Sequence, residues 1–198
     1  MDGHFYALLA RMRYIQRWAL MRNTEPENIQ EHSHMVAILA HALALLQNKH
    51  FGGHIDPGQA ALLALYHDAT EILTGDLPTP IKYYNPALRA SYKEVEETAA
   101  NRLLELLTEE LRGDYAPYLL HPDPELEAVV KAADKLDAYL KCVKERKAGN
   151  GEFQTAQAQI WDALQANPLP ALGYFIEHYL PSFELTLDQL NGSTHTMF

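Results

Sequence analysis

Helix starts are the sequence feature that most limits how this chain can fold. Three times, a short polar residue precedes a proline and an apolar-periodic stretch: at Asp56-Pro57, Asn85-Pro86 and Asp123-Pro124. Such a residue caps the first backbone N–H groups of a helix, and proline suits the first helical position because it lacks an N–H. The apolar residues that follow recur at helical spacing. These starts predict helices over residues 57–71, 86–107 and 124–147.

Helical patterns also fill most of the remaining chain. Asn28 and Glu31 have the form of a capping pair, in which two side chains satisfy N–H groups at the start of a helix. Apolar residues at helical spacing predict the other helices, which cover residues 2–20, 28–47, 152–165 and 171–178. The breaks between these helices are short and rich in glycine and proline, as is typical of turns.

The chain shows no sign of a second domain. Strand signals are nearly absent, and no long linker or internal repeat divides the sequence. A length of 198 residues suits one sizeable domain, and 47% hydrophobic residues can fill one core. We therefore predict a single all-α domain over residues 1–190, followed by a flexible tail over 191–198.

Charge and cysteine content exclude several classes of function. The formal net charge of −10 disfavours a nucleic-acid polymer as partner, because such binding rests on many Lys and Arg contacts to phosphate. A mononucleotide needs only one or two local cations and is not excluded. Cys142 is the single cysteine, so neither an intramolecular disulfide nor a cysteine zinc cluster can form. The first residues lack a signal-peptide pattern and no apolar stretch is long enough for a membrane span, so we expect a cytoplasmic protein.

Histidine and aspartate residues stand at inward-facing positions of three predicted helices. His32 heads the apolar stripe of its helix, and His67 and Asp68 come late in theirs. Asp134 follows two valines in the middle of a third helix. Such side chains are costly to bury unless they are paired or bind a metal, and their N/O set suits Mn, Fe, Co, Ni, Zn or Mg rather than copper. On spacing alone, Asp137 is an equally acceptable carboxylate.

Four stretches carry a more specific pattern: RWALMRN at residues 17–23, ENIQEHS at 27–33, YHDATEILTGDLPTP at 66–80 and AYLKC at 138–142. The order of histidine, His-Asp and aspartate resembles the signature of the HD phosphohydrolase superfamily. Together the stretches resemble the bacterial YfbR-type 5′-deoxynucleotidases over nearly the whole chain. The resemblance implies an HD-domain helical bundle that forms a homodimer.

The resemblance also implies a ligand set for a metal ion. It assigns His32, His67, Asp68 and Asp134 as ligands, and so prefers Asp134 to Asp137. We expect one divalent ion per subunit, with Co²⁺ as the first candidate and Mn²⁺, Mg²⁺, Zn²⁺ or Fe²⁺ as alternatives. Of these ligands, His32, Asp68 and Asp134 are also expected to border the substrate.

Arg17 and Trp18 are the first candidates for contact with a substrate. Taken alone, Arg17 is interpreted as a solvated arginine and Trp18 as a packing residue, both on the first predicted helix. The resemblance implies instead that Arg17 orients the phosphate, for which a forked guanidinium is suited. It implies that Trp18 closes the sugar pocket, where an indole against C2′ would exclude a ribose hydroxyl.

Glu71 and the loop after it are the second group of candidates. Glu71 follows His67 by four residues, which on one continuous helix places both on the same face. Glu71 can then orient water or protonate the leaving oxygen, a role that Asp76 could equally fill. The loop residues Asp76, Leu77, Pro78 and Thr79 are expected to bind the sugar 3′-hydroxyl and the phosphate.

These residues together predict an enzyme. The expected reaction is metal-dependent hydrolysis of deoxyribonucleoside 5′-monophosphates to deoxyribonucleoside and phosphate, with little preference among bases. Hydrolysis of a phosphodiester or a triphosphate is the nearest alternative. A nucleotide-sensing module without catalysis is an alternative of another class. No nucleic-acid polymer and no membrane is expected as a partner.

Overall fold

The structure is a computed structural model that describes residues 3–78, 81 and 84–192. Over these residues the chain is helical, and its only β-type pairing is an isolated bridge between Gln16 and Asn28. The α-helices are α1 (Phe5–Leu9), α2 (Ile29–His50), α3 (Pro57–Tyr66), α4 (Glu71–Thr74), α6 (Pro86–Glu105), α7 (Glu109–Leu119), α8 (Pro124–Lys147), α9 (Gln154–Gln165), α10 (Pro170–His178) and α11 (Leu187–Leu190). Three 3₁₀ helices accompany them: η1 (Ala10–Tyr14), η2 (Gly151–Phe153) and η3 (Leu180–Glu184). The predicted all-α class is confirmed.

The predicted helix starts are present. The side chains of Asp56, Asn85 and Asp123 each accept a hydrogen bond from backbone N–H groups of the helix that follows. At α2, Asn28 and Glu31 form the expected reciprocal capping box. Replacing one such N-cap residue by alanine typically costs about 1 kcal/mol, so these caps fix where each helix begins.

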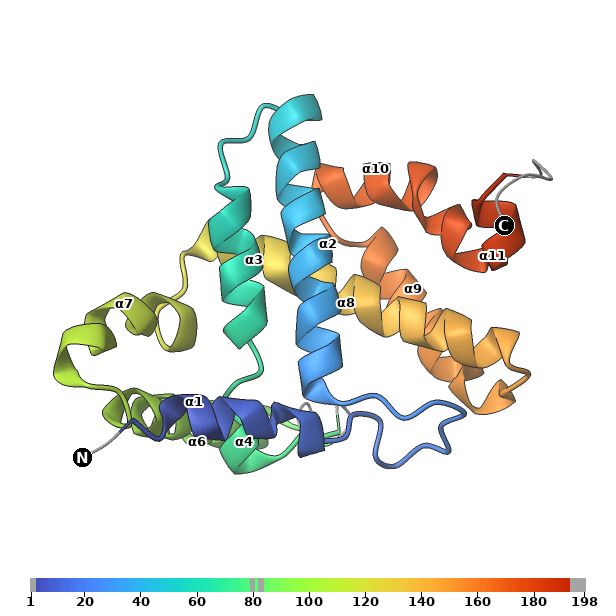
Figure 1. Cartoon of the computed structure of the whole chain (residues 1–198). Helices are drawn as coiled ribbons and strands as arrows, with labels where there is room; N and C mark the ends of the chain where they lie inside the picture. The colour runs from blue at the N-terminus through green and yellow to red at the C-terminus, as the bar shows by residue number, and fades with distance from the viewer. Residues whose placement is uncertain (1–2, 79–80, 82–83, 193–198) are drawn as a thin grey trace.

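Helices α2, α3 and α8 form the centre of the molecule. In Figure 1, α2 and α3 lie side by side in front of α8, which crosses behind them, while α9 and α10 lie on the far side of α2 from α3. The main core is made of apolar side chains from these helices, such as Leu43, Leu63 and Leu136, which are almost fully buried. A smaller core joins α1 to α6 through Phe5 and Leu103. Through the main core, α2 and α3 both pack against α8.

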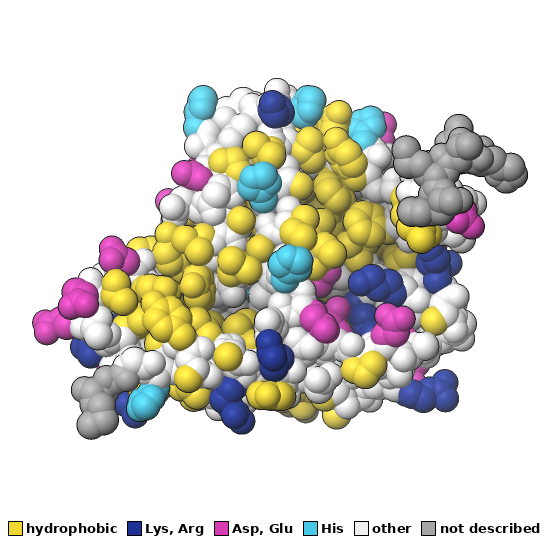
Figure 2. Space-filling view, in the orientation of Figure 1, with side chains coloured by type: hydrophobic (Ala, Val, Ile, Leu, Met, Phe, Trp, Pro, Cys, Tyr) yellow, Lys and Arg dark blue, Asp and Glu magenta, His cyan; other side chains and the backbone are white. Residues whose placement is uncertain are grey.

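Apolar side chains also reach the surface. Figure 2 shows them gathered over the face that α2 and α3 present in the orientation of Figure 1. Ile38 on α2 and Leu65 on α3 are 49% and 41% exposed. Within the described residues, no helix has both the length and the apolar composition needed to cross a bilayer.

The predicted helix over residues 2–20 is wrong beyond Tyr14. The chain leaves α1 through the short η1, and Ile15 is already extended. Gln16 then pairs with Asn28, so residues 16–28 form a loop that returns to the start of α2. Apolar spacing continued past Tyr14 in the sequence, but side chains of this loop find partners far along the chain, and those contacts end the helix.

Two further predictions need correction. The helix predicted over 57–71 breaks into α3 and α4, with a turn at residues 67–70 between them. The sequence pattern also missed α7. No α7 side chain is fully buried, although Leu111, Tyr115 and Leu119 pack against the smaller core, and Pro117 inside the helix argues against a helix in the sequence. In the predicted tail over 191–198, residues 193–198 lie outside the described part of the chain, and so does Thr79.

Candidate metal centre

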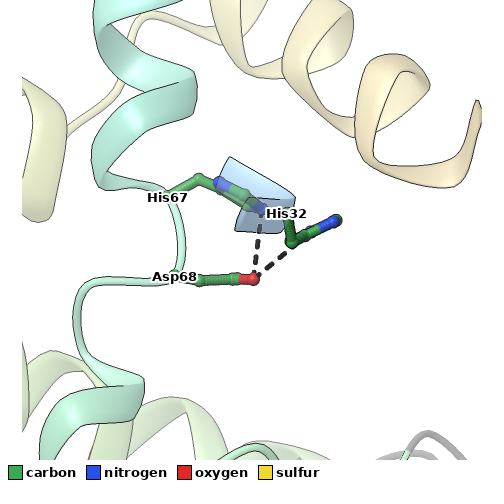
Figure 3. A group of neighbouring side chains, drawn as sticks. All are labelled: His32, His67 and Asp68. Atoms are coloured by element: carbon green, nitrogen blue, oxygen red, sulfur yellow. Dashed lines mark ion pairs between the residues drawn. The ribbon is translucent and has the colours of Figure 1, made fainter. Parts of the chain in front are cut away.

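His32, His67 and Asp68 meet where α2 begins and α3 ends. Figure 3 shows both imidazoles and the carboxylate turned toward one point. Asp68 Oδ2 lies 3.5 Å from His32 Nε2 and 3.3 Å from His67 Nε2. The ligand atoms of all three residues lie within 4.8 Å of one another. The break after Tyr66 explains how adjacent residues can serve one point, since side chains of neighbours on a regular helix diverge by about 100°.

The other ring nitrogen of each histidine is engaged. His32 Nδ1 lies 2.7 Å from Asp137 Oδ2, and His67 Nδ1 lies 2.7 Å from the carbonyl oxygen of Ala64. Both partners are acceptors, so Nδ1 donates in each case and Nε2 presents its lone pair to Asp68 when the ring is neutral. A ligand histidine in a metal site is typically oriented in this way.

The two carboxylates of α8 take different places around His32. Asp134 Oδ1 is 3.2 Å from His32 Nε2, and its side chain is 35% exposed at the edge of the group. Asp137 is buried behind the imidazole at Nδ1. The structure thus distinguishes the two carboxylates that helical spacing left as alternatives. Asp134 faces the side where a metal ion would bind, and Asp137 contacts the far side of the His32 ring. Asp134 is not within the compact group of three, so the four predicted ligands are only partly brought together.

The charges of this group favour a cation. Burial alone lowers the pKa of His32, but the neighbouring carboxylates of Asp134 and Asp137 outweigh burial and raise the pKa to about 9. At His67, the neighbouring Asp68 carboxylate outweighs burial in the same way and raises the pKa. Burial favours the neutral forms of both carboxyls, yet the histidines hold the pKa of Asp68 well below its usual range and lower that of Asp134 to about 2. The carboxylates that favour a proton on Nε2 equally favour a metal ion there.

The donor set fits a divalent ion. The Nε2 atoms of His32 and His67 are buried and lack a hydrogen-bond partner among the described residues. An unsatisfied buried polar atom is costly, and coordination would relieve that cost at both atoms. Two imidazole nitrogens with carboxylate oxygens are borderline-to-hard ligands, as Zn²⁺, Co²⁺, Fe²⁺ and Mn²⁺ accept.

Arg17 lies beside this centre, in the loop and not on a helix as expected. Its Nη1 donates to Glu27 Oε2 at 2.6 Å, and its Nη2 is 3.8 Å from Asp134 Oδ1. Burial alone lowers the pKa of Arg17, but Glu27, then Asp134 and Asp68, outweigh it and raise the pKa. The guanidinium is therefore a fixed, largely buried positive charge next to the candidate ligands.

Trp18 follows in a conformation that is unusual for any residue but glycine. Its φ angle is +59°, the single positive value among described non-glycine residues. The indole Nε1 donates to Glu27 Oε2 at 3.1 Å, and the ring packs against Phe153 with centroids 5.3 Å apart. Glu27 therefore binds Arg17 and Trp18 with one oxygen. Sequence reasoning gave Glu27 no role, because nothing in the local pattern shows that residues ten apart pair across a loop.

Glu71 and the following loop are less closely defined. Glu71 is buried at the start of α4. Glu71 does not share a continuous helix with His67 as predicted, because the turn at 67–70 separates them. Asp76, Leu77 and Pro78 are half-buried in the segment after Gly75, which has a φ of +73°. The substrate roles of these residues stay predictions.

The position of Asp137 leads to a first prediction. We expect Asp137→Asn to weaken metal affinity about 10- to 100-fold, because removing the partner that orients a ligand histidine has that typical effect. Metal titration of the stripped protein, read by catalytic activity and elemental analysis, measures the change. Asp162→Asn, at an exposed position of α9, is the matched control and should bind metal normally. Unchanged affinity in Asp137→Asn would show that the carboxylate does not support His32.

Comparisons with known proteins show the family to which the chain is similar. Residues 4–183 match the model of a family described as 5′-deoxynucleotidase YfbR-like. A 5′-deoxynucleotidase of Vibrio parahaemolyticus is 52% identical and one of Vibrio cholerae 51% identical, each over 192 residues that make up 96% of this chain and 99% of the relative.

Solved structures show the same fold at low identity. An HD-domain phosphohydrolase of Listeria innocua matches with a TM-score of 0.80 at 22% identity, covering 92% of this chain and 90% of that one. The HD phosphohydrolase of cyanophage S-2L, solved with dA and one catalytic Zn²⁺ ion, matches with a TM-score of 0.63 at 22% identity, covering 91% and 96%. The predicted HD-domain fold is confirmed.

Proposed function

Because this chain belongs to the YfbR-like 5′-deoxynucleotidase family, we propose that it hydrolyses deoxyribonucleoside 5′-monophosphates to deoxyribonucleosides and phosphate, with little preference among bases. The family resemblance inferred from the motifs is confirmed, and the chain is an enzyme of this class. The observation that carries the specific reaction is the partly buried group of His32, His67 and Asp68 with a fixed arginine beside it.

We propose that His32, His67, Asp68 and Asp134 hold one divalent ion. When bound, such an ion activates water and stabilises charge on phosphoryl oxygens. Co²⁺ is the ion first expected, and the Zn²⁺ of the cyanophage enzyme supports zinc as an alternative. The donor set itself fits both, along with Mn²⁺ and Fe²⁺, while Mg²⁺ is the hardest of the candidates.

The protein's own groups divide the remaining work. Arg17 binds the phosphoryl oxygens, since Glu27 and Asp134 keep its guanidinium charged and in place next to the ligands. Trp18 lies next to it in the loop and contacts the sugar at C2′. Glu71 or Asp76 donates a proton to the departing 5′-oxygen, which needs one when the ester bond breaks. Leu77, Pro78 and Thr79 complete the pocket for the sugar.

The homodimer and the cytoplasmic location are further parts of the proposal. The apolar face over α2 and α3, with Ile38 and Leu65 exposed, supports association of two copies. The net charge of −10 supports a small-molecule substrate over a nucleic-acid polymer.

A substrate panel tests the function directly. The protein is stripped with a chelator, reloaded separately with Co²⁺, Mn²⁺, Mg²⁺, Zn²⁺ or Fe²⁺, and assayed for phosphate release. We expect deoxyribonucleoside 5′-monophosphates to be cleaved with at least one ion, and ribo-, 3′- and cyclic nucleotides to be cleaved at lower rates or not at all. Equal turnover without added metal, or preference for a cyclic nucleotide, would contradict the proposal.

A further inference from the structure

The loop that carries Arg17, Trp18 and Glu27 is fixed at its base and at its tip. At the base, Arg17 N donates to the carbonyl oxygen of Glu27 at 2.9 Å, next to the bridge between residues 16 and 28. Between Arg17 and Glu27 the chain extends toward the C-terminal end of α8, as Figure 1 shows for the segment between η1 and α2. Pairing at the base leaves many backbone torsions of the outer part of the loop free, so contacts at its tip are needed to hold that part in one conformation.

Glu145, on α8, supplies those contacts at the tip. The backbone N–H of Thr24 donates to both carboxylate oxygens, at 3.1 and 2.9 Å, and that of Glu25 donates at 3.4 Å. Glu145 is 1% exposed although it is charged. A side chain 120 residues along the sequence therefore binds the backbone of the loop at two consecutive residues.

Two neighbours of Glu145 bind the same loop. Lys141 forms an ion pair with Glu145 and donates from Nζ to the carbonyl oxygen of Glu25 at 2.5 Å. Asn150 Nδ2 lies 2.8 Å from Glu145 Oε2 and 2.7 Å from the carbonyl oxygen of Arg22. Glu145, Lys141 and Asn150 thus each bind the loop and another member of the cluster, and Asn150 Oδ1 also accepts from Glu152 N at the start of η2. Lys141 and Asn150 are also buried.

The cluster and the candidate metal centre share one face of α8. Asp134, Lys141 and Glu145 are seven and four residues apart, a spacing that keeps side chains on one side of a helix. Asp134 faces His32 and Arg17 at one end of this face, and Glu145 binds the loop at the other. One rigid helix therefore sets the position of the ligand edge and of the loop that brings Arg17 and Trp18 to it.

Stability alone does not account for such a cluster. Replacing a buried ion pair with well-packed apolar residues is often neutral or stabilising, whereas directional hydrogen bonds fix a single geometry. Burial alone raises the pKa of Glu145, yet its contacts with Lys141, Asn150 and Thr24 hold it below the usual range. The carboxylate remains charged and so keeps all its hydrogen bonds.

We propose that Glu145 is a positioning residue for the substrate pocket: by binding the backbone at Thr24 and Glu25, it places Arg17 and Trp18 at the metal centre. The inference rests on the proposed roles of Arg17 and Trp18. It assigns Glu145 no contact with substrate or metal. Lys141 and Asn150 act with it.

Glu145→Gln tests the inference, because glutamine keeps the size but replaces one acceptor oxygen with an NH₂ group. We expect kcat/KM for a deoxyribonucleoside 5′-monophosphate to fall about 10- to 100-fold, the usual cost of misplaced binding groups. The preference for the deoxy- over the ribonucleotide should shrink as well. Metal content should stay unchanged, since Glu145 makes no contact with the ligand group. Glu152→Gln is the matched control, because exposed Glu152 binds only Arg22 of the same loop, through one hydrogen bond from Arg22 N and a 4.0 Å ion pair with Arg22 Nε.

A second readout reports on the loop without any substrate. Trp161→Phe leaves Trp18 as the one tryptophan, and Phe retains a ring against Tyr139. In this background, Glu145→Gln should make Trp18 fluorescence more accessible to acrylamide, while Glu152→Gln should not. Unchanged quenching would overturn the inference. So would full activity and discrimination in Glu145→Gln if Arg17→Ala and Trp18→Ala are themselves impaired.

The same experiments separate this inference from the proposed function. If Trp18→Ala and Arg17→Ala prove to be fully active, the proposed substrate contacts fail and the inference falls with them. If Glu145→Gln does not fold, Asn150→Ala removes one anchor from the edge of the cluster and should show the same changes at smaller size. Wild-type quenching and discrimination in Asn150→Ala would then count against the anchoring role.

Discussion

Asp68→Ala is expected to abolish metal binding and to lower activity by at least about 1,000-fold while the helices remain intact. The carboxylate meets the Nε2 atoms of both His32 and His67, and without it Asp134 is the one carboxylate left among the proposed ligands to offset a cation beside Arg17. Elemental analysis gives the metal content, phosphate release gives the activity, and circular dichroism confirms the helices. Asp162→Ala serves as the control at an exposed position. Full metal occupancy in an active Asp68→Ala protein would refute the proposed metal centre.

Trp18→Ala and Arg17→Ala should alter catalysis in different ways. If Trp18 excludes a 2′-hydroxyl by contact, its removal should raise the relative activity on the ribonucleotide. Exclusion of one polar group is typically worth about 10- to 1,000-fold in specificity. Arg17→Ala should lower kcat/KM for both substrates alike, by about 100-fold or more, because each carries the same phosphate.

The measurement is kcat/KM for paired deoxy- and ribonucleoside 5′-monophosphates in both variants. Trp18→Phe is an informative control, since it keeps an aromatic ring but loses the N–H that binds Glu27. Retained discrimination in Trp18→Phe would assign the effect to bulk. An unchanged deoxy-to-ribo ratio in Trp18→Ala would move the source of selectivity to the segment that contains Asp76.

Local signals predicted those parts of the fold that local chemistry determines. The caps at Asp56, Asn85 and Asp123 mark helix starts because each acts on N–H groups only two or three residues away. His32, His67 and Asp68 could be selected from motif and burial, and they do converge. Asp134 could be preferred over Asp137 only through the family resemblance.

The remaining features depend on contacts between distant residues. The first helix ends where the loop held by Glu27 and Glu145 begins. No residue within 2–20 gives a local signal that the helix stops there. The break at 67–70 lets His67 and Asp68 point toward one place, which adjacent residues of a regular helix would not do. Apolar periodicity runs through it unchanged. The α7 helix was missed because its inward side chains, such as Leu111, Tyr115 and Leu119, are only partly buried and its apolar pattern is interrupted by Gly113 and Pro117.

The positive φ angle of Trp18 carries a cost in folding stability at a residue proposed to contact the substrate. A bulky residue in the left-handed region costs about 1–3 kcal/mol, a sizeable part of the 5–15 kcal/mol that holds a typical domain folded. Glycine at this position would relax the torsion, but it would remove the hydrogen bond to Glu27, the ring packing against Phe153 and the side chain proposed to contact the sugar. Relief of the torsion is therefore set against contacts that hold the loop as well as against the proposed substrate contact. Consensus or thermostability design on this scaffold should accordingly leave position 18 unchanged.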